Sequence, residues 1–193
     1  MCGFCGILGG AERSSRDAIG AMTDALAHRG PDDHGVFEVR FEHGERHYDL
    51  ALGHRRLSII DLSKAGRQPM STKDGAITVA YNGEIYNFKA LRAELESLGH
   101  IFHSHTDTEV LLEAYRAWGL DALSRLVGMF AFALFDASKN RLVLARDRLG
   151  IKPLYYRFHE GLLTFGSELG SLRCHPAFQP EIDRRNLALF LQY

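Results

Sequence analysis

The sequence predicts an α+β fold in which antiparallel sheets pack on each other and helices cover the outside. Strand-like runs come in groups, and segments with helical spacing separate these groups. Residues 129–135 are almost wholly apolar, as expected of a strand that is buried on both faces. Ser138-Lys139-Asn140 then provides a turn into the next strand. This grouping favours packed layers, although the periodicity does not give their number.

The first half of the chain is expected to hold one helix and three strands. Ile19, Met22 and Leu26 recur at helical spacing, and Gly30-Pro31 ends that pattern. The turn residues His43-Gly44-Glu45 separate two strand patterns. The expected elements are a helix over residues 14–28 and strands over residues 36–41, 48–60 and 76–81, the last ending at Asn82-Gly83.

The second half is expected to begin with helices and to continue with strands. Leu91, Leu95 and Leu98 share one face of a helix that Asn87 can cap. A final helical pattern starts at Arg184 and is still apolar at Tyr193. The expected elements are helices over residues 88–98, 108–118, 120–126 and 184–193 and strands over residues 129–135, 141–146, 154–158 and 162–166.

Length and composition indicate one globular domain, covering residues 1–193. Hydrophobic residues make up 46% and charged residues 24%, with a net charge of −1, so nothing indicates a nucleic-acid partner. There is no apolar run of about 18 residues that would cross a bilayer, and no signal-peptide pattern at the N-terminus. We therefore expect a cytoplasmic protein without a membrane partner.

Three cysteines, Cys2, Cys5 and Cys174, do not make a disulfide framework. Cys2 and Cys5 have the C-x-x-C spacing, and His100, His103 and His105 could complete a zinc site with them. Because there is no second C-x-x-C, we favour solvated or hydrogen-bonded histidines and no metal. Cys5 is expected to be a small buried residue, since a strand would point the two thiols to opposite faces.

Cys2 directly follows the initiator methionine, so an aminopeptidase can expose it. The exposed residue carries an amine with a pKa of about 7.7–8.0 beside a thiol with a pKa of about 8.5, and the amine can accept the thiol proton. Nucleophile and base then share one residue. The alternative is that cysteine stands here by chance. If Met1 is retained, its acyl group removes the base, and we expect an inactive protein.

Asn82-Gly83 can supply two donors to an oxyanion, one from the Asn82 side chain and one from the Gly83 backbone. The alternative is an ordinary tight turn, because Asn-Gly favours one. Phe165-Gly166-Ser167-Glu168 is not a serine nucleophile motif. No phosphate-binding or dinucleotide-binding glycine motif is present, so nothing predicts ATP binding by this chain.

Arg56 and Asp107 are candidates for binding the two charged groups of an amino acid. Alternation places Arg56 on one face with Ser58 and Ile60, and Arg55 on the other with Leu57 and Ile59. A guanidinium clamps a carboxylate with two hydrogen bonds, whereas a surface position is favoured for Arg55. Asp107 precedes a helical pattern, so its default role is the N-cap, and its alternative role is to hold an α-ammonium group.

The charged segment over residues 146–156 lies between two strand patterns. It can be a salt-bridged structural corner or a contact to a second module. We favour the structural interpretation.

These motifs together resemble the glutaminase module of class II glutamine amidotransferases, the N-terminal-nucleophile type. Among these, the chain is most similar to the glutamine-hydrolysing asparagine synthetases, because the glucosamine-phosphate synthase cousins have their arginine in a different local sequence. The matching segments span nearly the whole chain: Met1-Cys2-Gly3, His28-Arg29-Gly30-Pro31-Asp32, Arg56-Leu57-Ser58-Ile59-Ile60-Asp61, Gln68-Pro69-Met70, Tyr81-Asn82-Gly83-Glu84-Ile85-Tyr86-Asn87, Asp107-Thr108-Glu109-Val110 and residues 128–133 and 145–156.

The resemblance implies a four-layer αββα sandwich, the N-terminal nucleophile hydrolase fold. It implies that Cys2 attacks the side-chain amide of L-glutamine, forms a glutamyl thioester and releases ammonia. Asn82 and Gly83 would hold the oxyanion. The glutamine would be held by Arg56, Glu84 and Asp107 and by the backbone of Leu57, Ser58, Ile59 and Ile60.

The resemblance also implies a synthetase module as partner, in cis or in trans, and a second copy of the chain is a further candidate. No cofactor is expected in this domain, since ATP and magnesium belong to that module. Because the pattern stops within a helix, we expect the domain to begin a longer chain. The alternatives are another ammonia acceptor (a sugar acid, a β-lactam precursor or a peptide) and a non-catalytic, partner-binding relic. Retention of all the site residues argues against the relic.

Overall fold

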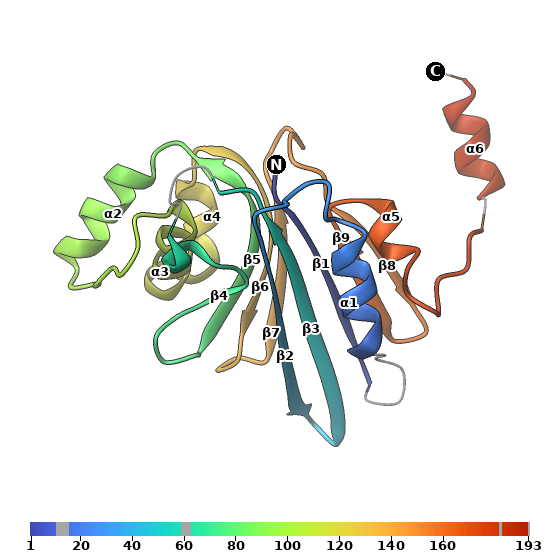
Figure 1. Ribbon diagram of the computed structural model, residues 1–193, viewed down its shortest axis with the longest axis horizontal. Helices are drawn as coiled ribbons and strands as arrows, with labels where there is room; N and C mark the ends of the chain where they lie inside the picture. The colour runs from blue at the N-terminus through green and yellow to red at the C-terminus, as the bar shows by residue number, and fades with distance from the viewer. Residues whose placement is uncertain (11–15, 59–62, 182, 193) are drawn as a thin grey trace.

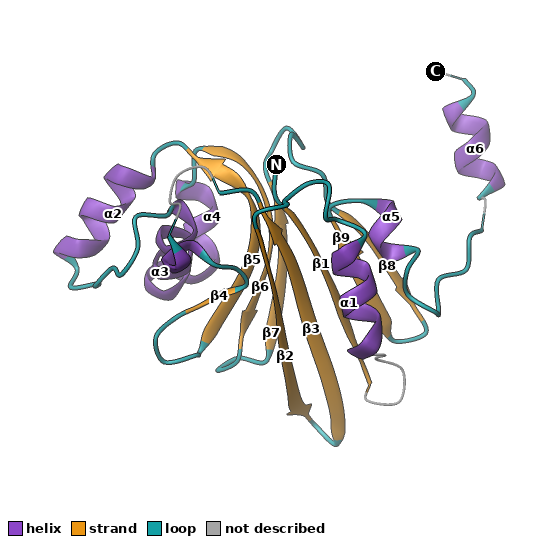
Figure 2. Cartoon of the chain, in the orientation of Figure 1, coloured by secondary structure: helices purple, strands orange, loops and turns teal. Residues whose placement is uncertain are grey.

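Two antiparallel sheets form the centre of the computed structural model, which describes residues 1–10, 16–58, 63–181 and 183–192 (Figures 1 and 2). Within these residues one sheet has five strands, in the order β2-β3-β1-β9-β8, and the other has four, in the order β4-β5-β6-β7. The strands of the first sheet are β1 (Gly3–Gly10), β2 (Asp33–His43), β3 (Arg46–Arg56), β8 (Tyr155–His159) and β9 (Leu162–Gly166). Those of the second are β4 (Met70–Ser71), β5 (Ile77–Ile85), β6 (Gly128–Asp136) and β7 (Arg141–Arg146).

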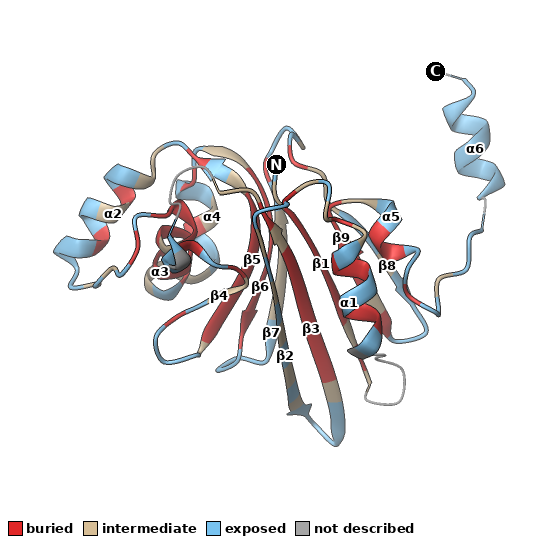
Figure 3. Cartoon of the chain, viewed as in Figure 1, coloured by how far each residue is buried: buried red, intermediate tan, exposed pale blue. Residues whose placement is uncertain are grey.

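Helices cover the outer face of each sheet (Figure 1). On the five-stranded sheet lie α1 (Arg16–Asp24) and α5 (Leu169–Leu172), and on the four-stranded sheet lie α2 (Phe88–Ser97), α3 (Asp107–Trp118) and α4 (Ala122–Arg125). Short 3₁₀ turns span Lys64–Gly66 and Gly119–Asp121. The last helix, α6 (Arg184–Phe190), lies apart from the sheets and is exposed along its length (Figure 3).

Three buried apolar clusters separate the four layers, which confirms the predicted αββα sandwich. The cluster between the sheets contains Phe4, Leu50, Leu52, Ala80, Ala131, Ala133, Phe135 and Phe165. A second cluster joins the four-stranded sheet to its helices, and a third joins the five-stranded sheet to α1. Alternation along a central strand divides its side chains between two clusters, so β1 places Phe4 between the sheets and Cys5 against α1.

The apolar run predicted over residues 129–135 is confirmed as a strand that is buried on both faces. Ala131, Ala133 and Phe135 face the other sheet, whereas Phe130 and Phe132 face the helices. Because both faces of β6 are covered, its side chains do not alternate between apolar and polar.

Two expected strand ends that lie near Arg56 and Asn82 are wrong. The strand expected over residues 48–60 is β3, and it ends at Arg56, while residues 59–62 lie outside the described residues. The strand expected to stop at Asn82-Gly83 continues to Ile85, because Asn82 and Gly83 pair with Ala131 and Phe130 of β6. Asn82-Gly83 is therefore a strand segment and not a turn. Glycine is required at Gly83, since a Cβ atom there would lie 2.5 Å from the Met129 carbonyl oxygen.

Helix ends also differ from the expectation. The helix expected over residues 14–28 is described from Arg16 and ends at Asp24, with turns over residues 25–29. Asn87 precedes α2 but does not cap it with its side chain. Instead its Nδ2 atom donates to the Arg125 carbonyl at 2.9 Å, and its Oδ1 atom accepts from the Val127 amide at 3.0 Å. Asn87 therefore joins α2 to the start of β6 rather than ending a helix.

The charged turn after β7 is a structural corner. The Asp147 carboxylate accepts backbone N–H groups from Phe130, Ile151 and Lys152 at 3.2, 2.9 and 2.9 Å. Arg146 donates to the Lys152 carbonyl at 2.7 Å. The expected salt bridges are thus replaced by charge-assisted bonds to the backbone, which hold the turn against β6.

Replacing Phe165 by alanine is expected to lower the free energy of unfolding by about 3–5 kcal/mol. Phe165 is 0% exposed between the sheets, so the change leaves a cavity. Phe158→Ala is the matched control, because Phe158 is 69% exposed on the neighbouring strand and should change stability by no more than about 0.5 kcal/mol. Urea unfolding measures both, and equal losses would contradict the layer assignment.

Candidate active site

A cavity of about 190 Å³ opens at the end of the sandwich where β1 begins and β3 and β5 end. It is lined by most of the predicted site residues: Cys2, Arg56, Leu57, Asn82, Gly83, Glu84 and Asp107. It also contains Gln68, Tyr81 and Lys152, to which the sequence assigned no role. The structure therefore brings together residues from Cys2 to Lys152, which lie far apart in the sequence.

Cys2 immediately precedes β1 and lies against the segment that follows β3. The backbone N–H of Leu57 donates to the Cys2 sulfur at 3.4 Å, and the Leu57 carbonyl lies 3.6 Å from it. Burial raises the pKa of the Cys2 thiol, although the Leu57 bond, the Met1 ammonium and the Arg56 guanidinium act in the opposite direction. Because the thiol is protonated at neutral pH, its use as a nucleophile requires a nearby base.

Asn82 and Gly83 present donors to this cavity. Asn82 is 2% exposed, and its Nδ2 atom has no hydrogen-bond partner in the described part of the chain. The N–H groups of Tyr81 and Ile85 point away from β6. Tyr81 donates to Gln68 Oε1 at 2.7 Å, and Ile85 donates to Asp107 Oδ2 at 3.0 Å. The Gly83 N–H also points away from β6, because the N–H groups of alternate residues in a strand point in the same direction. An orphaned buried donor is costly, so an acceptor is expected to bind here.

Asp107 is not the N-cap of α3, and the default expectation from the sequence is wrong. Thr106 caps the helix, because its hydroxyl accepts the Glu109 N–H at 3.1 Å. The Asp107 side chain is thereby free to turn toward β5, where it accepts from the Tyr81 hydroxyl at 2.7 Å and from the Ile85 N–H. Burial raises the pKa of Asp107, and these two hydrogen bonds act in the opposite direction.

Arg56 and Arg55 point to opposite faces of β3, as alternation predicts. Arg56 is 7% exposed, lines the cavity and donates to the Ser63 carbonyl at 3.0 Å. Arg55 instead pairs with Asp24 at the end of α1.

The predicted alternation does not extend beyond Arg56, because β3 ends there. Ser58 donates its N–H to Asp32 Oδ2 at 2.8 Å and is not among the residues that line the cavity. The role predicted for its backbone in holding a substrate stays a prediction. Ile59 and Ile60 lie outside the described residues.

The loop over residues 28–33 had no assigned role in the sequence, and the structure shows that it holds the site. Arg29 Nε donates to the Cys2 carbonyl at 2.9 Å, and its Nη1 pairs with Glu168 at 2.8 Å. The Asp32 N–H donates to the Arg56 carbonyl at 3.1 Å. The matching motif indicated that the loop mattered, but only the three-dimensional pairing shows that it anchors both Cys2 and the end of β3.

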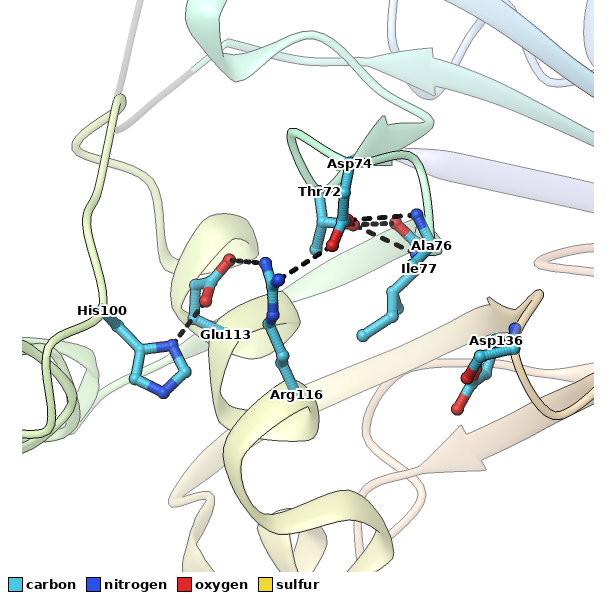
Figure 4. A network of polar contacts seen from close by, with 9 residues as sticks. Thr72, Asp74, Ala76, Ile77, His100, Glu113, Arg116 and Asp136 are labelled. Carbon is cyan, nitrogen blue, oxygen red and sulfur yellow. Dashed lines mark hydrogen bonds and ion pairs between the residues drawn. The ribbon is translucent and has the colours of Figure 1, made fainter.

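A larger hollow of about 870 Å³ lies beside α3 and contains His100 and His103, but not Cys2. Two ion pairs border it, since His100 pairs with Glu113 at 2.6 Å, and Arg116, which lines the hollow, pairs with Asp74 at 2.8 Å (Figure 4). Within the described residues no group of histidine, cysteine and acidic side chains is placed to hold a metal. His100 therefore serves as a hydrogen-bonded partner of α3.

The αββα sandwich with β1 at the centre of its five-stranded sheet is the fold of the N-terminal nucleophile hydrolases. A solved structure of glutamine phosphoribosylpyrophosphate amidotransferase from Bacillus subtilis has this fold, with a TM-score of 0.74, 24% identity, and coverage of 90% of this chain and 43% of that one. The chain belongs to the glutamine amidotransferase domain family, which matches residues 1–193.

Longer proteins carry similar sequences. The chain is 41% identical to asparagine synthetase [glutamine-hydrolyzing] 3 of Bacillus subtilis, over 97% of this chain and 30% of that protein. It is 38% identical to amidase chry2 of Gibberella zeae, over 86% of this chain and 24% of that protein. The chain thus spans less than a third of the length of these relatives. No helix in its described part is both long and apolar enough to cross a membrane.

Alkylation is expected to distinguish the two N-terminal cysteines in the Met1-bearing chain. Cys2 lines the cavity, and burial raises the pKa of its thiol, so its reaction with iodoacetamide should accelerate as the pH is raised and the thiolate forms. Cys5 is 0% exposed and its pKa is raised to about 12 by burial, so it should react only after unfolding. Peptide mass spectrometry with a Cys2→Ala control assigns the sites, and equal labelling of Cys5 in the folded protein would contradict this geometry.

Proposed function

We propose that this domain hydrolyses L-glutamine to L-glutamate and ammonia, with Cys2 as the nucleophile once Met1 has been removed. The observation that carries the proposal is the convergence on one cavity of the Cys2 thiol and the Asn82 amide, whose Nδ2 has no partner among the described residues. Arg56 would bind the α-carboxylate of glutamine, and Asp107 would bind its α-ammonium group. The glutamine side chain would then reach Cys2.

The reaction proceeds through a thioester. The freed α-amine of Cys2 takes the thiol proton, and the sulfur attacks the side-chain carbonyl carbon of glutamine. The resulting oxyanion accepts hydrogen bonds from Asn82 Nδ2 and the Gly83 N–H. The carbon–nitrogen bond breaks, and the leaving ammonia takes the proton from the Cys2 ammonium. Water, deprotonated by the same amine, attacks the thioester and releases glutamate and the thiol.

Met1 controls this chemistry because its carboxyl group converts the Cys2 nitrogen to an amide. Met1 is 60% exposed and borders the cavity, so its removal both creates the base and enlarges the space beside Cys2. The orphaned Asn82 donor argues against a non-catalytic relic, since burying such a donor has a cost without a substrate.

The ammonia would pass to an ATP-dependent synthetase module, in cis or in trans. Relatives named asparagine synthetase support aspartate amidation, while the fungal relative named amidase shows that similar domains occur in proteins with other names. A sugar acid, a β-lactam precursor or a peptide stays an alternative acceptor. A second copy of the chain and a cytoplasmic location stay predictions from the sequence.

The test combines a glutaminase assay with N-terminal mass analysis of the same sample. Protein that lacks Met1 should release ammonia from L-glutamine, and protein that retains Met1 should not. Full turnover by a Met1-bearing sample would refute the proposed base.

Asn82→Ala should lower kcat by about 10²–10³-fold, with a smaller change in KM, because its hydrogen bond strengthens in the transition state. Asn186→Ala is the matched control, since Asn186 is an exposed residue of α6 that bonds to Asp183. Steady-state ammonia release measures both. An unchanged kcat in Asn82→Ala would remove Asn82 from the oxyanion site.

Arg56→Lys should raise KM for glutamine by about 10–100-fold, because a point charge replaces a two-pronged clamp. Arg55→Lys is the control, since Arg55 pairs with Asp24 on the other face of the same strand. The KM of the control should match that of the unaltered domain. A similar rise in both variants would show that Arg56 acts through folding rather than through the substrate.

A further inference from the structure

His54 is a fully buried histidine that the reaction described above does not use. It lies in β3 at 0% exposure, two residues before Arg56, and therefore on the same face of the strand. That face is the one that places Leu52 between the two sheets. The imidazole ring thus occupies the layer between the sheets, next to the cavity end of the sandwich.

The ring crosses this layer and bonds to the backbone of the opposite sheet. His54 Nε2 lies 2.9 Å from the Tyr81 carbonyl oxygen. A carbonyl only accepts, so Nε2 carries the hydrogen, and Nδ1 has no hydrogen-bond partner in the described part of the chain. Burial lowers the pKa of His54 to about 4. The ring is therefore a neutral donor throughout the physiological pH range.

The Tyr81 carbonyl needs this donor because, in the described residues, no strand pairs with β5 at this position. β4 pairs with β5 only at Val79 and Thr78, and in the described residues no strand lies beside that edge at Tyr81. The Tyr81 N–H donates to Gln68 Oε1 at 2.7 Å, and the Tyr81 carbonyl accepts from His54. Two side chains thus satisfy the backbone groups that a strand would otherwise pair.

We propose that His54 is a positioning residue that holds β5 at Tyr81, and with it the adjacent Asn82 and Gly83 donors, in register with Cys2. This inference rests on the proposed glutaminase function. β3, which carries His54, pairs directly with β1, where Gly3 lies opposite Arg55. The chain of contacts therefore runs from Cys2 through β1 and β3 to His54 and across to the residue before Asn82.

Two substitutions of His54 distinguish a role of its hydrogen bond from a role of its volume in the core. A leucine would fill much of the space of the ring but would leave the Tyr81 carbonyl without its donor. A glutamine would place an amide nitrogen near the position of Nε2 and keep the bond. If His54 acts by position, the hydrogen bond matters more than the volume, because misplacement by about 1 Å costs up to about 10²-fold in rate.

The test uses the Met1-free domain and four variants. His54→Leu should lower kcat by about 10–100-fold with little change in KM, and His54→Gln should recover most of the loss. His54→Asn, whose amide is too short to reach Tyr81, should resemble His54→Leu and serves if the leucine variant does not fold. His47→Leu is the matched control on the same strand, since the His47 side chain is 61% exposed, and it should match the unaltered domain.

A double variant shows whether His54 acts through Asn82. In an Asn82→Ala background, His54→Leu should cause little further loss of kcat, because the donor that it positions is already gone. A full additional loss, or a His54→Gln variant as slow as His54→Leu, would overturn the inference.

Amide hydrogen exchange at residues 81–83 tests the positioning without activity. Exchange there should be faster in His54→Leu than in His54→Gln, and exchange that is equal in the two would overturn the positioning role. If the unaltered domain releases no ammonia, the proposed function fails, and the exchange result still decides whether His54 holds this segment of β5.

Discussion

Apolar packing between the two sheets determines where each proposed catalytic group lies. Phe4 and Phe165 of one sheet meet Ala131 and Phe135 of the other in a fully buried layer. This contact fixes the position of β1 relative to β5, and therefore the position of Cys2 relative to Asn82. The small alanines of β6 and the large phenylalanines opposite them suit a single close approach of the sheets. The polar site is built at the end of that layer.

Burial is also what makes the chemistry of the site depend on its local partners. The same loss of solvent raises the pKa values of Cys2 and Asp107 and lowers that of His54. Each of these groups is thus biased toward its neutral form. An uncharged thiol is a poor nucleophile, so a base on the same residue provides a direct solution. Low exposure to solvent would likewise strengthen the bonds that Asn82 and Gly83 offer to an oxyanion.

The layers, most elements and most of the site could be predicted from the sequence, since they depend on local pattern or on the family resemblance. The apolar run of β6 and the opposite faces of Arg55 and Arg56 follow from alternation alone. The local pattern ends β5 at Asn82-Gly83, whereas the strand continues to Ile85, because the conformation of these residues depends on pairing with β6. Asp107 was misread as a cap, because Thr106 competes for that role. The functions of Arg29 and His54 depend on contacts that are distant in sequence, and no local signal shows them.

In the proposed mechanism Cys2, Asn82 and Gly83 converge on the side-chain carbonyl of one bound amino acid. A crystal structure of the Met1-free domain, alkylated by a glutamine-like diazo-ketone, tests it most directly. The inhibitor should be bonded to the Cys2 sulfur, with its ketone oxygen accepting from Asn82 Nδ2 and the Gly83 N–H. Its carboxylate should meet Arg56 and its ammonium Asp107. An adduct on Cys5 or Cys174, or a ketone oxygen directed away from Asn82, would contradict it.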